Sequence, residues 1–224
     1  ELQLLDLSDI DLTDDNLKEM AQIGLFNNVP RLVLSHNPRL TGRGIAWVAE
    51  SGFASLQELH LSGNMQLIKT NLSQWIEKDG FKNLISLNLA ATGITENELE
   101  QMIEKAEWFR KLKGLNLDWN DDLRKFPSNI LKLTNLDDHA VDDSQLLSGG
   151  PIYFHGAGIF CRGCKNLTCT KEILQLAMKG KVFGIVDNHR SLNLKNIANS
   201  SIGVKQIYDS YKVSFEEDKS ETIL

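Results

Sequence analysis

Apolar residues recur along the first half of the chain in one pattern: an apolar residue, two others, a leucine, one other and a leucine. The pattern occurs five times, at Leu2, Leu5, Leu7; Val29, Leu32, Leu34; Leu56, Leu59, Leu61; Leu84, Leu87, Leu89; and Leu112, Leu115, Leu117. Successive copies begin 27, 27, 28 and 28 residues apart. Alternate residues of a strand point to the same side, so each copy predicts a short strand with one buried face. One strand cannot bury that face alone, and we therefore expect the copies to stack and share a core.

Between the strands, apolar residues recur at helical spacing. The pattern predicts helices near residues 14–24, 43–51, 71–79 and 96–110. In the last of these, Thr95 followed by Glu98 predicts a capping box, in which each side chain bonds the backbone of the other residue. Three tryptophans lie in the helical stretches and are expected to pack in the core rather than bind a ligand: Trp47, Trp75 and Trp108.

Asparagine stands three positions after the last leucine of the pattern in three copies, at Asn37, Asn64 and Asn120. Its amide both donates and accepts hydrogen bonds, so it can bond the backbone of the sharp turn that follows each strand. The period, the leucine positions and these asparagines together resemble the leucine-rich repeat family. The resemblance implies an α/β fold, a horseshoe-shaped solenoid with a parallel sheet on the concave face and helices on the convex face.

The fifth copy is of a shorter type, with an extended convex side, and a sixth, degraded strand is predicted near 136–141, with His139 in place of a leucine. We therefore expect five clear repeats and one degraded repeat over residues 1–144. The chain begins directly on a repeat strand, without the polar cap that terminal repeats need, and we expect further sequence upstream.

The period disappears after about residue 144, and Gly149, Gly150 and Pro151 mark a boundary. Residues 151–215 are predicted to form a small C-terminal α+β unit, with a helix near 171–179 and strands near 181–187 and 204–215. The charged residues 216–224 are predicted to be a disordered tail.

All three cysteines of the chain lie within nine residues of this unit, at Cys161, Cys164 and Cys169, and His155 precedes the first by six. Three thiolates and one imidazole complete a tetrahedral structural zinc site, so one zinc ion held by these four residues is a candidate cofactor. His189 is the second choice for the imidazole ligand. The alternatives are buried thiols, or one disulfide with a leftover cysteine.

The composition and the sequence motifs argue against several classes of function. The formal net charge is −6 and the basic residues are scattered, which does not indicate nucleic-acid binding. No run of eighteen apolar residues occurs, so no membrane-spanning helix is predicted. The chain shows no Ser/His/Asp order, phosphate-binding glycine loop or His-Glu-x-x-His motif. We expect an intracellular protein, nuclear or cytoplasmic, that is not an enzyme; an enzyme with a zinc or thiol centre in the C-terminal unit is the less favoured alternative.

The segment after the repeats carries Phe154-His155, the cysteines, a predicted helix and Ile185-Val186-Asp187-Asn188, in that order. This order resembles the C-terminal region of the leucine-rich repeat substrate receptors of cullin-2 RING ubiquitin ligases. The resemblance implies a substrate-recognition subunit whose partners are elongin B/C and cullin-2. Such receptors bind elongin B/C through a box of the type (Ser/Ala/Pro/Thr)-Leu-x3-(Cys/Ser/Ala)-x3-aliphatic, and residues 141–154 contain no clean copy of it. The alternative is a leucine-rich repeat scaffold or adaptor unrelated to ubiquitin.

A protein partner is expected on the concave face, where strand residues that point away from the core face solvent. The candidate partner-binding residues are Arg31, Val33, Glu58, His60, Asn88, Asn116, Asp118 and Trp119. Trp119 stands beside the asparagine position, where it need not belong to the core, and an exposed tryptophan is a favoured interface anchor. The alternative is that Trp119 packs on its neighbours.

Overall fold

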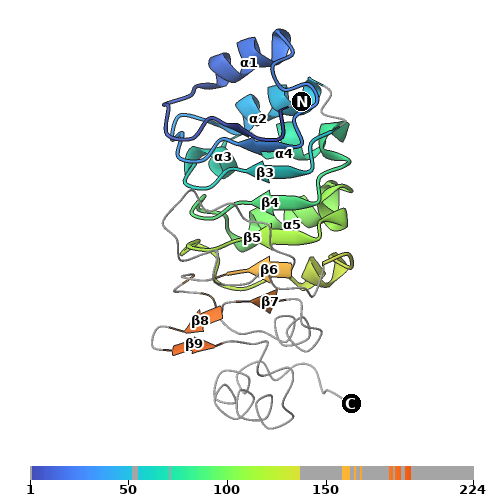
Figure 1. Ribbon diagram of the computed structural model, residues 1–224. Helices are drawn as coiled ribbons and strands as arrows, with labels where there is room; N and C mark the ends of the chain where they lie inside the picture. The colour runs from blue at the N-terminus through green and yellow to red at the C-terminus, as the bar shows by residue number, and fades with distance from the viewer. Residues whose placement is uncertain are drawn as a thin grey trace.

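The computed structural model describes residues 2–51, 55–70, 72–136, 158–161, 164, 167, 182–183, 185–187 and 190–192. Within these residues, one parallel sheet contains seven strands that lie side by side in chain order (Figure 1). They are β1 (Leu5–Asp6), β2 (Arg31–Val33), β3 (Glu58–His60), β4 (Ser86–Asn88), β5 (Gly114–Asn116), β6 (Gly158–Phe160) and β7 (Val182–Phe183). Two further strands, β8 (Ile185–Asp187) and β9 (Arg190–Leu192), pair antiparallel in a second sheet.

The register of the parallel sheet follows the sequence repeat. Equivalent residues of successive copies are paired, so one row runs across the sheet through Leu5, Leu32, Leu59, Leu87, Leu115 and Ile159. The leucines of this row from Leu32 to Leu115 are fully buried. The predicted strand positions of all five copies are therefore confirmed, and the strands form where a row of leucines can be removed from water.

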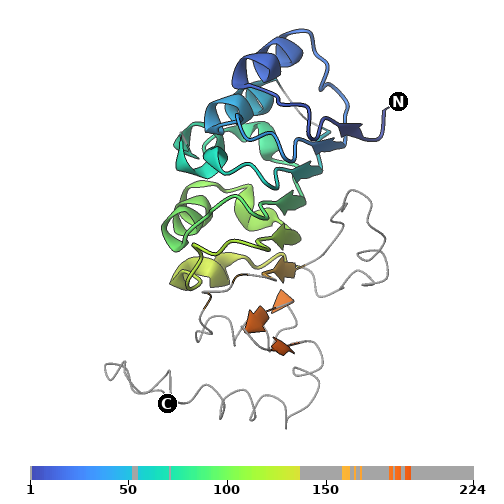
Figure 2. The same ribbon diagram turned by 90° about the vertical axis from the view of Figure 1, so that its left-hand side faces the viewer.

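The helices lie on the opposite side of the molecule from the strands, which gives an α/β arrangement with one helical layer (Figure 2). They are α1 (Asp14–Gln22), α2 (Gly42–Glu50), α3 (Gln66–Lys69), α4 (Leu72–Ile76) and α5 (Glu96–Lys105), with short 3-10 turns η1 (Asp79–Phe81), η2 (Phe109–Lys111) and η3 (Ser128–Lys132). In the described part of the chain, no helix has the length and apolarity needed to cross a membrane.

Threonines set the helix starts at the same place in three repeats. Thr13, Thr41 and Thr95 are the N-cap residues of α1, α2 and α5. The capping box predicted for Thr95 and Glu98 is present, and the Glu98 carboxylate accepts hydrogen bonds from the Thr95 backbone N–H and hydroxyl.

Two helix predictions need correction. The helix expected near 71–79 is shorter, because α4 ends at Ile76. It is preceded by α3, which ends at Lys69, and the extended backbone of Thr70 lies between the two helices. The helix expected at 96–110 ends at Lys105, because Ala106 adopts an extended conformation and the chain then forms η2.

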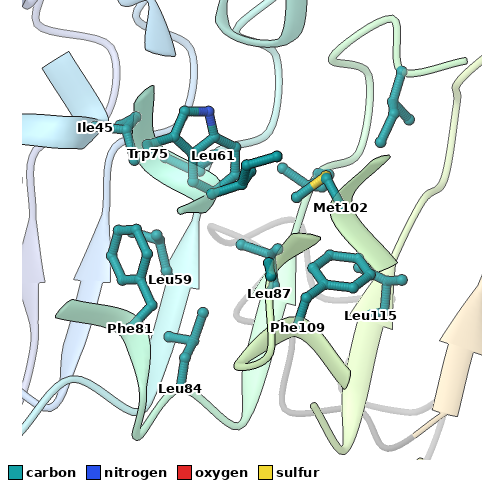
Figure 3. Close-up of a cluster of buried hydrophobic side chains, with 14 of the residues drawn as sticks. Ile45, Leu59, Leu61, Trp75, Phe81, Leu84, Leu87, Met102, Phe109 and Leu115 are labelled. Carbon is teal, nitrogen blue, oxygen red and sulfur yellow. The ribbon is translucent and has the colours of Figure 1, made fainter. Parts of the chain in front are cut away.

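The core lies between the sheet and the helices. Figure 3 shows leucines from the strands, including Leu59, Leu87 and Leu115, facing Trp75, Phe81 and other side chains from the helical side. Trp75 and Trp108 are buried as expected, with ring centroids 6.0 Å apart, and the Trp108 Nε1–H donates to the Ile76 carbonyl at 2.9 Å. Trp47 is only half-buried, and the Lys18 ammonium lies 5.0 Å from its ring centroid.

The predicted end of the repeat region is wrong, because the sheet continues beyond it. The neighbour of β5 is β6, in which Ile159 pairs with Leu115, and β7 follows β6. Hence the place next to β5 is not taken by the expected strand at 136–141, of which only the buried Leu136 is among the described residues. The boundary at 144–151 does not separate residues 158–160 and 182–183 from the sheet. The helix expected near 171–179, the strand near 204–215 and the tail 216–224 lie outside the described residues.

Candidate protein-binding surface

The parallel strands all end at one edge of the sheet, and the same turn follows five of them. At this turn Asp9, His36, Gly63, Ala91 and Trp119 have left-handed backbones, with φ of 56°, 56°, 76°, 52° and 61°. The first four of these residues donate their backbone N–H to a carbonyl of the next repeat: to Ser35, Ser62, Ala90 and Asp118, at 3.1, 2.8, 2.9 and 2.8 Å. These bonds extend the strand-to-strand ladder beyond the sheet and hold the turns in register.

Buried asparagine side chains hold the same turns by hydrogen bonds to the backbone. The Asn64 amide donates to the Leu34 and Leu61 carbonyls at 3.0 and 2.9 Å, and its Oδ1 accepts from the Asn37 backbone N–H at 2.7 Å. Asn37 and Asn120 likewise donate to the carbonyls of two successive repeats. All three side chains are fully buried. The predicted asparagine ladder is confirmed, and the edge it supports is a rigid base for surface residues.

We name the residues of this edge the carboxyl-edge strip: 8–11, 35–39, 62–66, 90–93 and 118–122. Three large apolar side chains of the strip are exposed to solvent: Ile10 at 54%, Met65 at 44% and Trp119 at 63%. With neighbouring strands about 4.8 Å apart, Ile10 and Trp119 are separated by four strand steps, about 19 Å. The strip is therefore a line of exposed apolar side chains across the ends of β1 to β5.

Short contacts at two glycines show how the strip is built. A Cβ placed on Gly63 would lie 2.4 Å from His36 Nδ1, so the imidazole of the exposed His36 covers the Gly63 backbone. A Cβ placed on Gly93 would lie 3.3 Å from Met65 Cε, 3.6 Å from Lys69 Cε and 3.7 Å from Asp122 Oδ2. A thioether, a lysine side chain and a carboxylate thus converge over Gly93, close to the turn that carries Trp119.

Trp119 has a costly conformation for a residue that contributes little to the core. A left-handed backbone costs a side chain other than glycine roughly 1–2 kcal/mol, and Gly63 avoids that cost at the equivalent position. The exposed indole regains little of this by burial. Asp9, His36 and Ala91 have the same backbone conformation at the equivalent turns, so it belongs to the repeat, and what distinguishes Trp119 is the exposure of its indole.

The expectation that the other candidate binding residues face solvent is wrong for five of them. Val33, His60, Asn88, Asn116 and Asp118 are between 2% and 4% exposed. The Asn88 and Asn116 side chains turn back to their own chain, where each Oδ1 accepts the N–H two residues later, from Ala90 at 2.9 Å and from Asp118 at 2.8 Å. The oxygens of these amides thus cap the ends of β4 and β5.

Three ionisable side chains lie close together on β2 and β3: Arg31, Glu58 and His60. His60 stands between Val33 and Asn88 in the register, with its Nε2 3.9 Å from Glu58 Oε2. Arg31 Nε lies 3.9 Å from Glu58 Oε1, and the Arg31 side chain is 40% exposed against 16% for Glu58. Of the eight predicted residues, Trp119 is thus the most exposed, followed by Arg31, and a role in binding stays a prediction for all eight.

Cys164 occupies a place in the ladder that sequence reasoning did not assign to it. Its Sγ donates to the Leu117 carbonyl at 3.1 Å, which the Asn120 amide also contacts at 2.9 Å. The spacing Ile159-x-Cys161-x2-Cys164 matches Leu115-x-Leu117-x2-Asn120, and Cys161 is fully buried in the core. The matching spacing indicates a further repeat in the sequence. A search for a period of 27 or 28 residues does not find this repeat, because Ile159 lies 44 positions after Leu115.

In the described structure the Cys164 thiol bonds a backbone carbonyl, that of Leu117. The pKa of this thiol is raised to about 12, mainly by burial and in addition by the nearby Asp118 and Asp121 carboxylates. Within the described residues, no three His, Cys, Asp or Glu side chains gather into a possible metal site. His155, Cys169 and His189 lie outside those residues, so the complete four-ligand site stays a prediction.

Comparison with known proteins gives no relative from which a role could be transferred: no family model matches the chain, and no curated protein matches it.

Proposed function

We propose that this chain is a leucine-rich repeat protein, a horseshoe-shaped solenoid, and that it recognises a protein partner without catalysing a reaction. The partner binds along the carboxyl-edge strip, with Trp119 as the central anchor. The observation that carries the proposal is the 63% exposed indole held in a left-handed turn on a rigid edge. Large aromatic residues on a rigid support are the usual anchors of protein interfaces, because they bury much area at little cost in conformational entropy.

The exposure pattern favours this edge over the strand face that points away from the helices. Side chains of that face are nearly inaccessible at His60, Asn88 and Asn116, whereas Ile10, Met65 and Trp119 are each at least 44% exposed. A partner chain laid across the strip would cover about 19 Å, the length of roughly six extended residues. The proposed interface is thus long enough for a peptide segment.

The test is quantitative affinity capture with the intact chain and three variants. Trp119→Ala should reduce the amount of the specific partner retained, in line with a loss of about 2 kcal/mol or more. Trp119→Gly should reduce it equally, yet leave the free energy of unfolding within about 1 kcal/mol of wild type or higher, because glycine accepts the left-handed backbone without strain. Leu131→Ala, at an exposed leucine of η3 on the helical side, is the matched control and should retain the partner.

Equal retention of every partner by wild type and by both Trp119 variants would overturn the proposal. So would a partner whose retention falls with Leu131→Ala and not with Trp119→Gly.

A more specific form of this function is the substrate-recognition subunit of a cullin-2 RING ubiquitin ligase in the nucleus or cytoplasm. It is supported by the sequence resemblance of residues 154–188. Its test is direct binding of purified elongin B/C, with cullin-2 added afterwards. Failure of the intact chain to bind elongin B/C would leave the scaffold or adaptor function in place and remove the ligase assignment.

A thiol enzyme is the less favoured alternative, because a nucleophilic cysteine requires a lowered thiol pKa and the pKa of Cys164 is raised. Alkylation of the native chain tests it: we expect Cys164 to react far more slowly than a small-molecule thiol at neutral pH. Rapid modification of Cys164 in folded protein would restore this alternative.

A further inference from the structure

The turn that carries Trp119 contacts a residue that lies far along the sequence. In the first four turns of the carboxyl-edge strip, the left-handed residue donates its backbone N–H to a carbonyl of the next repeat. The repeat next to the fifth turn begins with β6, where Ile159 pairs with Leu115. Cys164 occupies the ladder position of that repeat, so a thiol contacts the turn that carries the proposed anchor.

The asparagines of the ladder hold the turn of the preceding repeat by accepting a backbone N–H from it. The Asn64 Oδ1 accepts from the Asn37 N–H at 2.7 Å. The Asn120 Oδ1 accepts from the Thr92 N–H at 3.0 Å. In both cases the donor directly follows the left-handed residue, so the bond restrains the turn where the left-handed backbone ends.

Cys164 makes the corresponding contacts with the fifth turn. Its Sγ donates to the Leu117 carbonyl at 3.1 Å. Burial raises the pKa of the thiol, and the backbone N–H groups of Asn120 and Trp119 lower it in part, which places both N–H groups near the sulfur. The thiol thus stands where the other ladder side chains stand, on the residue that follows Trp119 and on Trp119 itself.

We infer that Cys164 is a positioning residue for the proposed partner-binding site, and that its thiol keeps the Trp119 turn, and with it the indole, in the binding orientation. This inference rests on the proposed function, and it adds a residue that acts on the anchor from the neighbouring repeat. Cys164 is 1% exposed, so it acts through Trp119 and not by contact with the partner. An anchor that is already held in its bound conformation loses less conformational entropy on binding.

The test measures the affinity of three variants of the intact chain for one probe. The probe is a peptide selected from a random displayed library on the intact chain and counter-selected on Trp119→Gly. Cys164→Val keeps an apolar side chain of similar size but removes the hydrogen-bonding group, and it should raise the dissociation constant about three- to tenfold. Cys164→Asn supplies the amide of the other ladder positions and should bind the probe at least as tightly as wild type.

Ile159→Val is the matched control. It removes one buried carbon from β6, in the same repeat as Cys164 but on the strand that pairs with β5 and not at the turn. It should leave the dissociation constant of the probe unchanged.

A second measurement follows Trp119 directly and needs no partner. The chain has four tryptophans, so labelling with fluorotryptophan should give four fluorine resonances, and the resonance lost in Trp119→Gly belongs to Trp119. In Cys164→Val this resonance should shift or broaden while the other three keep their positions. A general loss of stability would not select one tryptophan in this way.

An unchanged Trp119 resonance or an unchanged dissociation constant in Cys164→Val would overturn the inference and leave the proposed function standing. So would a loss of affinity in Cys164→Asn, or a loss in Ile159→Val as large as that in Cys164→Val. A library that yields no Trp119-dependent peptide would overturn both the inference and the proposed function.

Discussion

Removing the Asn64 side chain should destabilise the protein severely, and the hydrogen bonds around it give the magnitude. In Asn64→Ala, the Asn37 backbone N–H loses its acceptor and the Leu61 carbonyl loses the amide that donates to it. The Leu34 carbonyl keeps a bond from the Asn37 amide at 3.0 Å. Two buried backbone groups are thus left unpaired, at about 1–3 kcal/mol each, so we expect a loss of about 2–6 kcal/mol.

The assay is urea unfolding followed by circular dichroism, with two further variants. Asn97→Ala changes an exposed asparagine of α5 and should alter the free energy of unfolding by no more than about 0.5 kcal/mol. Thr92 occupies the ladder position of the fourth repeat, and its hydroxyl donates only to the Leu89 carbonyl of its own repeat, at 2.8 Å. In Thr92→Asn, the longer amide side chain could also donate to a backbone carbonyl of the preceding repeat, as the Asn120 amide does. We expect this variant to be more stable than wild type by about 0.5–1.5 kcal/mol.

Equal urea midpoints for Asn64→Ala and Asn97→Ala would show that the asparagine ladder does not stabilise the turns. The inference that the carboxyl-edge strip is rigid would then be wrong as well.

Three other changes test the leucine row, the close packing at Gly80 and the burial of Cys164. Leu87→Asp should cost about 4 kcal/mol or more, because it buries an unpaired charge in the central leucine row, and a wild-type melting curve for this variant would refute the register. Gly80→Ala should cost about 1–3 kcal/mol, because its Cβ would lie 1.9 Å from the Ala49 carbonyl oxygen; unchanged stability would contradict that close approach. Because the folded-state pKa of Cys164 is raised to about 12, its thiol ionises first in the unfolded chain as the pH rises. Stability should therefore fall between about pH 9 and 12, by about 1.4 kcal/mol per pH unit relative to Cys164→Asn, and identical pH profiles for the two proteins would refute the burial of this thiol.

The parts of the fold predicted correctly from sequence are those that one repeat determines by itself. Leu32, Leu59 and Leu87 had to lie on one buried face, and Asn64 had to bond a turn, whatever the rest of the chain does. The period supplied the stacking order, because equivalent strands of equal repeats pair with one another. These features follow from local pattern and from the need to bury apolar area.

The errors arose where the answer depends on residues far apart in sequence. The sheet receives β6 at Ile159, 44 residues after Leu115, and a search at fixed period places the next strand too early. The same gap hides the equivalence of Cys164 to Asn120, whereas the zinc site predicted from the spacing of the cysteines stays a prediction. The exposure of His60 depends on what lies against it in three dimensions, and alternation along a strand contains no such information. For Trp119 the position beside the asparagine was informative, because that position lies beyond the strand and outside the leucine row.

Site-specific photo-crosslinking tests whether the partner binds along the carboxyl-edge strip. A photoreactive amino acid would replace Met65 in the carboxyl-edge strip, or Leu131 on the helical side as the control, in otherwise intact chains incubated with the captured partner. Both side chains are exposed, so accessibility does not bias the comparison. The account predicts that position 65 crosslinks to the partner, that Trp119→Gly abolishes this crosslink, and that position 131 does not crosslink. A crosslink from position 131 with none from position 65 would contradict it.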